Sequence, residues 1–301
     1  MIAPMAPKTQ KTPKAPMPSI KSNLHTHTTL CDGRATVDEM AQAAVRLGFT
    51  ALGFSGHATS AIGASCCIKD MAAYRSAVAE AKAKYLGALD IYCGIENELL
   101  EPYDAAPFDY SIGSVHHVLG ADGVFHVIDF TPGLALAGIR EGFGGDGLAF
   151  ARAYYGSIAK ICSNPAPTPP ADILGHFDII RKFNGDGALF DDTAKSYRSA
   201  ALAALEQVCA CGMLLEVNTA PVAQGLSDEP YPARFILERA LELGMRVAVG
   251  SDAHAPERLD AHFAQTAQLL ADIGFTETWE LTPSGFAPRP LTDKMPYPGS
   301  S

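Results

Sequence analysis

Short apolar runs alternate with longer stretches of helical periodicity along most of the chain. Seven of these runs have the length and the flanking turn residues of β-strands. They cover residues 23–27, 51–57, 90–96, 110–117, 172–176, 213–218 and 246–254. Strands that alternate with helices form parallel sheets, and a parallel sheet that closes on itself makes a barrel. The pattern therefore predicts an α/β fold, a (β/α) barrel of about seven strands.

The segments between these runs have the apolar spacing of helices that cover a sheet. Thr36-Val37-Asp38-Glu39 has the form of a capping box, and a helix is expected from there to Gly48. Further helices are expected over residues 69–86, 148–161, 193–211, 232–243 and 257–273. The Gly-rich region 121–147 has no clear assignment.

The ends of the chain differ from its middle in composition. Residues 1–20 carry proline and lysine at short intervals and predict a flexible extension. Residues 281–301 are rich in proline and predict an irregular tail. The expected organisation is therefore a single barrel domain over residues 21–280 between two irregular ends.

Composition limits the kinds of partner. The 301 residues are 48% hydrophobic and carry a net charge of −10. The negative charge argues against nucleic acid as a partner, because proteins that bind nucleic acid need a basic face.

No run reaches the length of a membrane span, and the first residues lack the apolar core of a secretory signal. The seven cysteines show no zinc-binding or disulfide spacing, so we interpret them as reduced. We expect a cytoplasmic protein with a small substrate. The sequence leaves the oligomeric state open.

Histidines and carboxylates recur where the predicted strands end. His25 and His27, like Asp252 and His254, stand two residues apart, so each pair projects from one face of its strand. Asp32 precedes the turn residue Gly33 and can return toward His27. The C-terminal ends of barrel strands form the rim where barrel enzymes carry their chemistry. The residues expected at this rim are His25, His27, Asp32, His57, Glu96, His116, His176, Asp252 and His254.

These nine side chains are too many for one ion and suit two or three divalent ions. Glu96 is the natural bridge, since its two oxygens can bind separate ions. Imidazole and carboxylate ligands without thiolates fit Zn, Mn or Fe at a hydrolytic site. The alternative for each residue alone is a partly exposed or hydrogen-bonded side chain, and their recurrence at one rim favours the metal site.

The motifs resemble those of the PHP (polymerase and histidinol phosphatase) superfamily over residues 22–275. They are His25-Thr26-His27 with Asp32-Gly33, Gly53-Phe54-Ser55-Gly56-His57, Gly94-Ile95-Glu96, Gly113-Ser114-Val115-His116, Gly175-His176-Phe177-Asp178 and Ser251-Asp252-Ala253-His254. The resemblance implies a distorted (β/α)7 TIM-like barrel with two or three metal ions. Its ligand sets would be His25, His27, Glu96 and Asp252 for one ion, Glu96, His116 and His176 for a second, and Asp32, His57 and His254 for a third.

Other stretches, such as Phe177 to Lys182 and Glu216-Val217-Asn218-Thr219, resemble the monofunctional histidinol-phosphate phosphatases. The resemblance implies hydrolysis of L-histidinol phosphate in histidine biosynthesis. We hypothesise that a hydroxide bridging two ions attacks phosphorus in line. We assign catalytic roles to Asp32, His254 and Arg181, the last as the cation that binds phosphate.

One departure affects the substrate. After Asn218-Thr219 this family is expected to place a basic residue, whereas the chain continues Ala220-Pro221-Val222-Ala223-Gln224-Gly225. Two alternatives therefore stay open. One is a PHP phosphoesterase that acts on a nucleotide or sugar phosphate, and the other is a nucleic-acid-processing or polymerase-associated PHP module.

Overall fold

Seven parallel strands form the centre of the protein in the computed structural model, which describes residues 20–63, 66–163 and 168–291. Their order in the sheet is β1-β2-β3-β4-β7-β8-β9. The strands are β1 (Ser22–Asn23), β2 (Ala51–Phe54), β3 (Asp90–Glu98), β4 (Tyr110–Ser114), β7 (Ile173–Leu174), β8 (Leu214–Asn218) and β9 (Val247–Gly250). A parallel bridge between Thr26 and Ala253 joins the two outer strands just past their ends. The seven-stranded barrel predicted from the sequence is confirmed.

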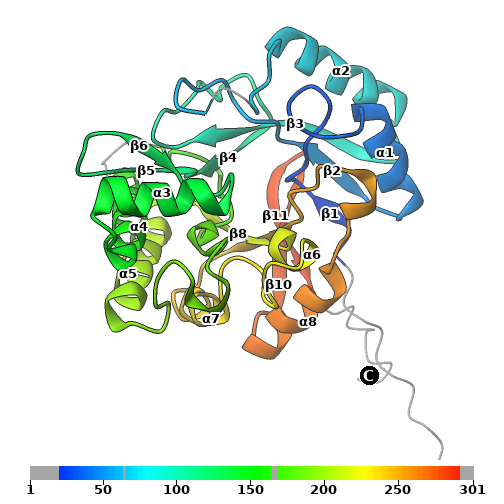
Figure 1. The fold of residues 1–301 in the computed structure, drawn as a ribbon. Coiled ribbons are helices and arrows are strands. Elements are labelled where there is room, and N and C mark those ends of the chain that lie inside the picture. Colours follow the sequence, from blue (N-terminus) through cyan, green and yellow to red (C-terminus); the bar gives the residue numbers. More distant parts are fainter. Residues whose placement is uncertain (1–19, 64–65, 164–167, 292–301) are drawn as a thin grey trace, which may run out of the picture.

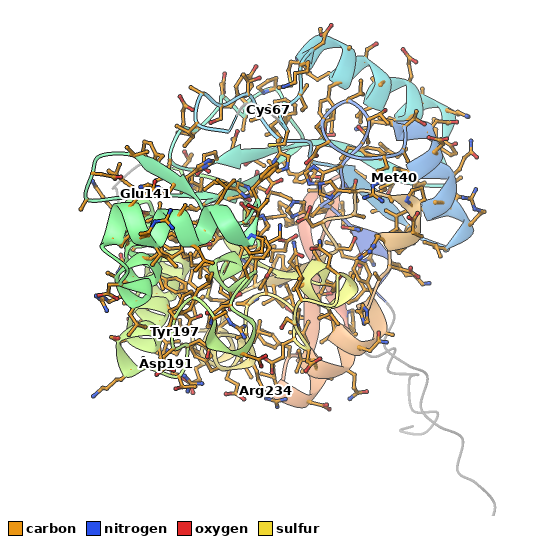
Figure 2. All side chains as sticks on the ribbon, viewed as in Figure 1. Met40, Cys67, Glu141, Asp191, Tyr197 and Arg234 are labelled. Atoms are coloured by element: carbon orange, nitrogen blue, oxygen red, sulfur yellow. The ribbon has the colours of Figure 1, made fainter. Side chains whose placement is uncertain are left out.

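Helices surround this barrel (Figure 1). They are α1 (Val37–Arg46), α2 (Met71–Lys84), α3 (Pro132–Phe143), α4 (Gly147–Cys162), α5 (Lys195–Cys211), α6 (Ala220–Ala223), α7 (Arg234–Glu242) and α8 (Phe263–Ile273), with short 3-10 turns at Ile179–Arg181, Gly185–Gly187 and Pro256–Arg258. Side chains fill the space between the helices and the strands, and Met40 of α1 is fully buried there (Figure 2).

Helix α1 begins as the sequence predicts. The Thr36 hydroxyl accepts the Glu39 N–H at 3.2 Å, and the Glu39 carboxylate accepts the Thr36 N–H at 2.8 Å. This reciprocal pair satisfies two N–H groups that the first turn of a helix leaves without partners. The capping box therefore fixes where the chain turns from the first rim segment into the outer layer.

The Gly-rich region left unassigned contains defined structure outside the barrel. After β4 the chain forms the antiparallel pair β5 (His117–Leu119) and β6 (Phe125–Val127) and then helix α3. Gly138 and Gly142 let α3 approach this pair, because a Cβ on Gly142 would lie 2.6 Å from His126 Nε2. We call residues 117–143 the excursion, and it borders the rim of the barrel.

A hairpin closes the opposite end of the barrel. Strands β10 (Glu277–Thr282) and β11 (Gly285–Pro290) pair antiparallel, and Leu281 is buried against residues that begin the barrel strands, including Tyr110, Ile173 and Leu214. The irregular tail predicted for residues 281–301 is therefore wrong for residues 281–290. The prolines mislead because β11 is an edge strand, where a missing N–H is tolerated.

The remaining end predictions fall mostly outside the described residues. Residues 1–19 and 292–301 are not among them. Ile20, placed by the sequence in the flexible extension, is buried and packs in the main core. Within the described part of the chain, no helix is both long and apolar enough to cross a membrane.

Replacing Leu281 by alanine should test the role of the hairpin. Its side chain is 6% exposed at the closed end of the barrel, so the substitution should lower the free energy of unfolding by about 2–4 kcal/mol. Leu86→Ala is the matched control because Leu86 is 85% exposed, and surface changes of this kind stay within about 0.5 kcal/mol. Equal effects of the two substitutions in urea unfolding would contradict the packing role of the hairpin.

Candidate metal centre

All nine residues predicted at the rim meet at the C-terminal ends of the strands. The short segments that follow β1, β2, β4, β7 and β9 carry the histidines, and Glu96 lies within β3. Their ligand atoms fall into four overlapping groups. These are His27–Asp32–His57–His254, His25–Glu96–His176, His25–His27–Asp252 and His57–Glu96–His116.

Glu96 is at the centre of the cluster and is 2% exposed. Its Oε2 atom lies 3.2 Å from His25 Nε2, 3.4 Å from His27 Nε2 and 3.1 Å from His57 Nδ1. Its Oε1 atom lies 3.3 Å from His116 Nε2 and 3.0 Å from His176 Nε2. One carboxylate therefore faces five imidazoles, and the bridging of two ions by Glu96 stays a prediction.

Several of these buried atoms have no hydrogen-bond partner. Among the described residues they are His25 Nε2, His27 Nε2, His116 Nε2, His176 Nδ1 and Glu96 Oε2. Buried polar atoms are almost always hydrogen-bonded, because leaving one without a partner costs about 1–3 kcal/mol. Unpaired nitrogen and carboxylate oxygen atoms beside one another are the ligands that divalent transition metals take. The donor set of the cluster therefore fits metal ions.

The charges of the cluster also favour bound cations. Burial raises the pKa of Glu96, but His57, His25, His116 and His176 outweigh it and hold that pKa well below its usual value. Burial lowers the pKa of His25, but Glu216, Glu96 and Asp252 outweigh it and hold that pKa well above its usual value. The buried carboxylates thus need positive charge beside them, which protons supply in the metal-free chain and ions can replace.

The backbone is strained at two of the nine residues. His176 and Asp252 have positive φ angles of 22° and 49°, a region that residues other than glycine rarely enter. Each such residue costs about 1–3 kcal/mol and persists where its surroundings fix it. Both residues lie just after a barrel strand, β7 or β9, and belong to the cluster, so the strain lies at the candidate site.

The ion-by-ion ligand sets stay a prediction, and the grouping differs from them in one respect. His25, His27 and Asp252 lie together, as do Asp32, His57 and His254. His116 lies in one group with His57, and His176 lies in another group with His25. The resemblance instead implies that His116 and His176 bind the same ion. His116 and His176 nevertheless face the same oxygen of Glu96, since Oε1 lies 3.3 Å from His116 Nε2 and 3.0 Å from His176 Nε2.

Glu216 is a buried carboxylate beneath the cluster to which the sequence reasoning gave no place in the site. Its Oε1 atom lies 2.7 Å from His25 Nδ1, and its Oε2 atom accepts the His176 N–H at 2.8 Å. A Cβ on Gly250 would lie 2.1 Å from Glu216 Oε1, so the glycine makes room for it. A charged residue between Leu215 and Val217 in an apolar strand was the signal that could have revealed it.

Asp129 and Glu98 support the other side of the cluster. Asp129 Oδ2 lies 3.2 Å from His116 Nδ1, and Glu98 Oε2 accepts the His116 N–H at 3.0 Å and lies 3.0 Å from His117 Nδ1. Asp129 follows β6 in the region without a predicted structure, and no pattern in the sequence indicated its role. A carboxylate on the second nitrogen of a metal-binding imidazole fixes its orientation.

Arg181, the predicted phosphate-binding cation, does not line the cavity beside the cluster. Its guanidinium contacts Asp178 at 3.3 Å and Asp192 at 3.5 Å, and it lines a separate pocket with Asn184 and Tyr231. The cluster of candidate ligands opens into a different cavity of 530 Å³, which Lys182 also lines. Among the described lining residues, Lys182 is the one lysine or arginine. The role predicted for Arg181 stays a prediction, but of these two adjacent cations it is Lys182 that lines the cavity beside the cluster.

Comparisons with known proteins agree with this geometry. The PHP domain family matches residues 23–220 of the chain. A probable histidinol-phosphatase of Deinococcus radiodurans is 30% identical over 270 residues, which cover 83% of this chain and 92% of that protein.

Two solved structures share the fold. A candidate histidinol phosphatase of Listeria monocytogenes superposes with a TM-score of 0.68 at 23% identity, over 81% of this chain and 99% of that one. The histidinol phosphate phosphatase of Lactococcus lactis, solved with zinc, L-histidinol and phosphate, gives a TM-score of 0.67 at 17% identity, over 89% and 98%. At these identities the likeness concerns the fold.

Proposed function

The chain belongs to the PHP domain family and is a metal-dependent phosphatase, and from this premise we propose that it hydrolyses L-histidinol phosphate to L-histidinol and phosphate. The observation that carries the proposal is the buried cluster of unpaired ligand atoms at the end of a cavity lined by Lys182. The relative from Deinococcus radiodurans supports the choice of substrate by its name and by matching most of the chain.

We propose that the nine rim residues hold two or three divalent ions. Their imidazole and carboxylate donors suit Zn, Mn or Fe, and zinc is the metal in the Lactococcus lactis structure. Bound ions would activate water and neutralise charge on the phosphate oxygens. Glu96 would contact more than one ion, since its two oxygens face separate groups of imidazoles.

The other residues of the cavity would bind and orient the substrate. Lys182 takes the place that the sequence reasoning gave to Arg181, and its ammonium would bind the phosphate. Asp32 and His254 lie 3.3 Å apart, and their side chains are 31% and 34% exposed at the cavity. Their exposure would let them contact the substrate, and it supports the catalytic roles that we propose for them.

The free cysteines and the net charge of the chain support the location and the partner that we propose. All seven cysteines lie in the described part of the chain and are free thiols there, in keeping with the reducing cytoplasm that we propose. The partner we propose is a small phosphorylated metabolite rather than nucleic acid, because the chain carries a net charge of −10.

A substrate panel tests the proposed function. With the metal-loaded protein, we expect kcat/KM to be highest for L-histidinol phosphate among phosphate monoesters that include a nucleotide and a sugar phosphate. Faster turnover of either of these would reassign the substrate within the family. Salt-dependent DNA binding without turnover of any small phosphate would favour the nucleic-acid module instead.

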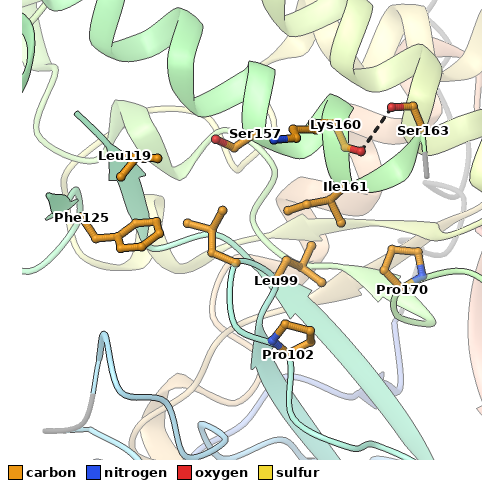
Figure 3. A pocket seen from close by; sticks show the side chains of 10 residues that line it. Leu99, Pro102, Leu119, Phe125, Ser157, Lys160, Ile161, Ser163 and Pro170 are labelled. Atoms are coloured by element: carbon orange, nitrogen blue, oxygen red, sulfur yellow. Dashed lines mark hydrogen bonds between the residues drawn. The ribbon is translucent and has the colours of Figure 1, made fainter. Parts of the chain in front are cut away.

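Replacing Lys182 by alanine should weaken substrate binding. A hydrogen bond to a charged group contributes about 1.5–3 kcal/mol, so KM for the substrate should rise about 10–100-fold while the metal content stays unchanged. Lys160→Ala is the matched control, because Lys160 lines a separate pocket with Leu119 and Phe125 (Figure 3). An unchanged KM in Lys182→Ala would show that the phosphate is bound without this cation.

A further inference from the structure

One carboxylate of the excursion, that of Asp129, lies beside the candidate metal centre. Asp129, between β6 and α3, has a side chain that is 16% exposed, and its Oδ2 atom lies 3.2 Å from His116 Nδ1. The same oxygen lies 3.8 Å from Lys182 Nζ. Asp129 therefore contacts both a candidate metal ligand, which follows β4, and the cation of the cavity, which follows β7.

His116 is held from several sides. Its backbone N–H donates to Glu98 Oε2 at 3.0 Å. Its backbone carbonyl accepts the Ile128 N–H at 3.0 Å, which joins the residue before the excursion to the segment that follows β6. Its Nε2 atom faces Glu96 and, among the described residues, has no hydrogen-bond partner. If Nδ1 carries the proton and donates it to Asp129, the lone pair lies on Nε2, where an ion can take it.

Lys182 depends on the same carboxylate. The Lys182 side chain is 25% exposed, and within the described residues Asp129 is the carboxylate that pairs with it. The ammonium also lies 5.8 Å from the centre of the Phe183 ring. A long flexible side chain loses rotamer freedom when it is fixed, so a paired carboxylate that holds the ammonium in the cavity lowers that cost when substrate binds.

We propose that Asp129 is a positioning residue that orients His116 for its ion and Lys182 for the phosphate at the same time. This inference rests on the proposed function. It gives the excursion a role in the site, because the segment outside the barrel supplies the link between two residues of the rim.

A purely structural role makes a different prediction. The excursion is also held by the packing of His126 against Gly138 and Gly142, which does not involve Asp129. If Asp129 only anchored the segment, its loss would lower stability and leave the affinity of each ion in the folded protein unchanged. Metal affinity therefore separates positioning from anchoring.

The test measures ion affinity by competition with a chelator in Asp129→Ala and Asp129→Asn. Loss of the partner of a metal-binding histidine typically weakens the ion about 10–100-fold, so Asp129→Ala should weaken one ion by this factor and leave the others unchanged. Asp129→Asn keeps an acceptor for His116 but loses the charge facing Lys182. It should therefore keep more of the ion affinity while KM rises.

Asp122→Asn is the matched control, since Asp122 pairs with His126 in the same excursion at 3.0 Å and does not touch the cluster. In Asp129→Asn combined with Lys182→Ala, the KM increase should be smaller than the product of the two single increases. Wild-type affinity for every ion in both Asp129 variants, or independent effects on KM, would overturn the proposal.

The chelator measurement needs no substrate. Failure of the wild-type protein to hydrolyse L-histidinol phosphate would therefore reject the proposed function without deciding the link between Asp129 and His116. Unchanged ion affinity in a variant of an active enzyme would reject that link alone.

Discussion

Glu96→Gln should lower kcat for L-histidinol phosphate by at least about 10³-fold, which corresponds to ~4 kcal/mol of the barrier. Glutamine has nearly the same shape, but it removes the charge and replaces one oxygen by an NH2 group. The two Glu96 oxygens face five imidazoles at 3.0–3.4 Å, so the change would affect each ion that Glu96 is proposed to hold. The assay is steady-state turnover together with metal analysis of the same sample.

Glu80→Gln provides the control, because Glu80 is exposed on α2 and its carboxylate contacts Ser76 on the same helix. His25→Ala and Asp252→Ala should act in the same direction as Glu96→Gln. Full activity in Glu96→Gln at unchanged metal content would show that the reaction does not need the Glu96 carboxylate.

Removing the ions should destabilise the protein. A ligand at a hundred times its Kd stabilises the folded state by about 2.7 kcal/mol, which corresponds to a change in Tm on the order of 5 °C for a chain of this size. We therefore expect chelation to lower Tm and readdition of the metal to restore it. An unchanged Tm after complete removal of the ions would contradict a metal centre built from the barrel rim.

The pKa shifts of the histidines determine the direction in which stabilisation by metal changes with pH. In the metal-free chain, the pKa of His25 stands well above its usual value, so the stability that it contributes is fully present below about pH 6.5 and is lost as the pH rises through the raised pKa. His27 and His116 shift in the same direction. Ions bind the deprotonated imidazoles, so the stabilisation by metal grows as the pH rises.

The difference in Tm between the loaded and metal-free proteins should therefore widen from about pH 6 to about pH 8. Thermal unfolding with and without metal across this range measures it. A difference that narrows with rising pH would mean that the histidines of the rim are not the ligands.

The barrel and the assembly of the rim could be predicted because both follow from local patterns. Alternating apolar runs fix the order of strands and helices, and parallel strands bring their C-terminal ends together. His25 and Asp252 follow the first and the last strand of the barrel, yet the closed sheet places His25 Nε2 3.6 Å from Asp252 Oδ1. The residue types at strand ends were therefore sufficient to predict which residues meet.

The support around the rim could not be predicted in the same way. Asp129 lies between β6 and helix α3, and the packing of α3 against His126 of β6 depends on Gly138 and Gly142. The choice between Arg181 and Lys182 depends on the rotation of one 3-10 turn after His176, which has a positive φ angle. Such details depend on tertiary contacts that apolar periodicity does not encode.

The most direct test of the metal-dependent phosphatase is a titration of the metal-free chain with Zn, Mn or Fe(II). Bound ions per chain and hydrolysis of L-histidinol phosphate should be measured on the same preparation. We predict that hydrolysis is absent without ions and appears as two or three ions bind per chain. Hydrolysis by the ion-free chain, or a filled metal centre that leaves L-histidinol phosphate intact, would contradict the account.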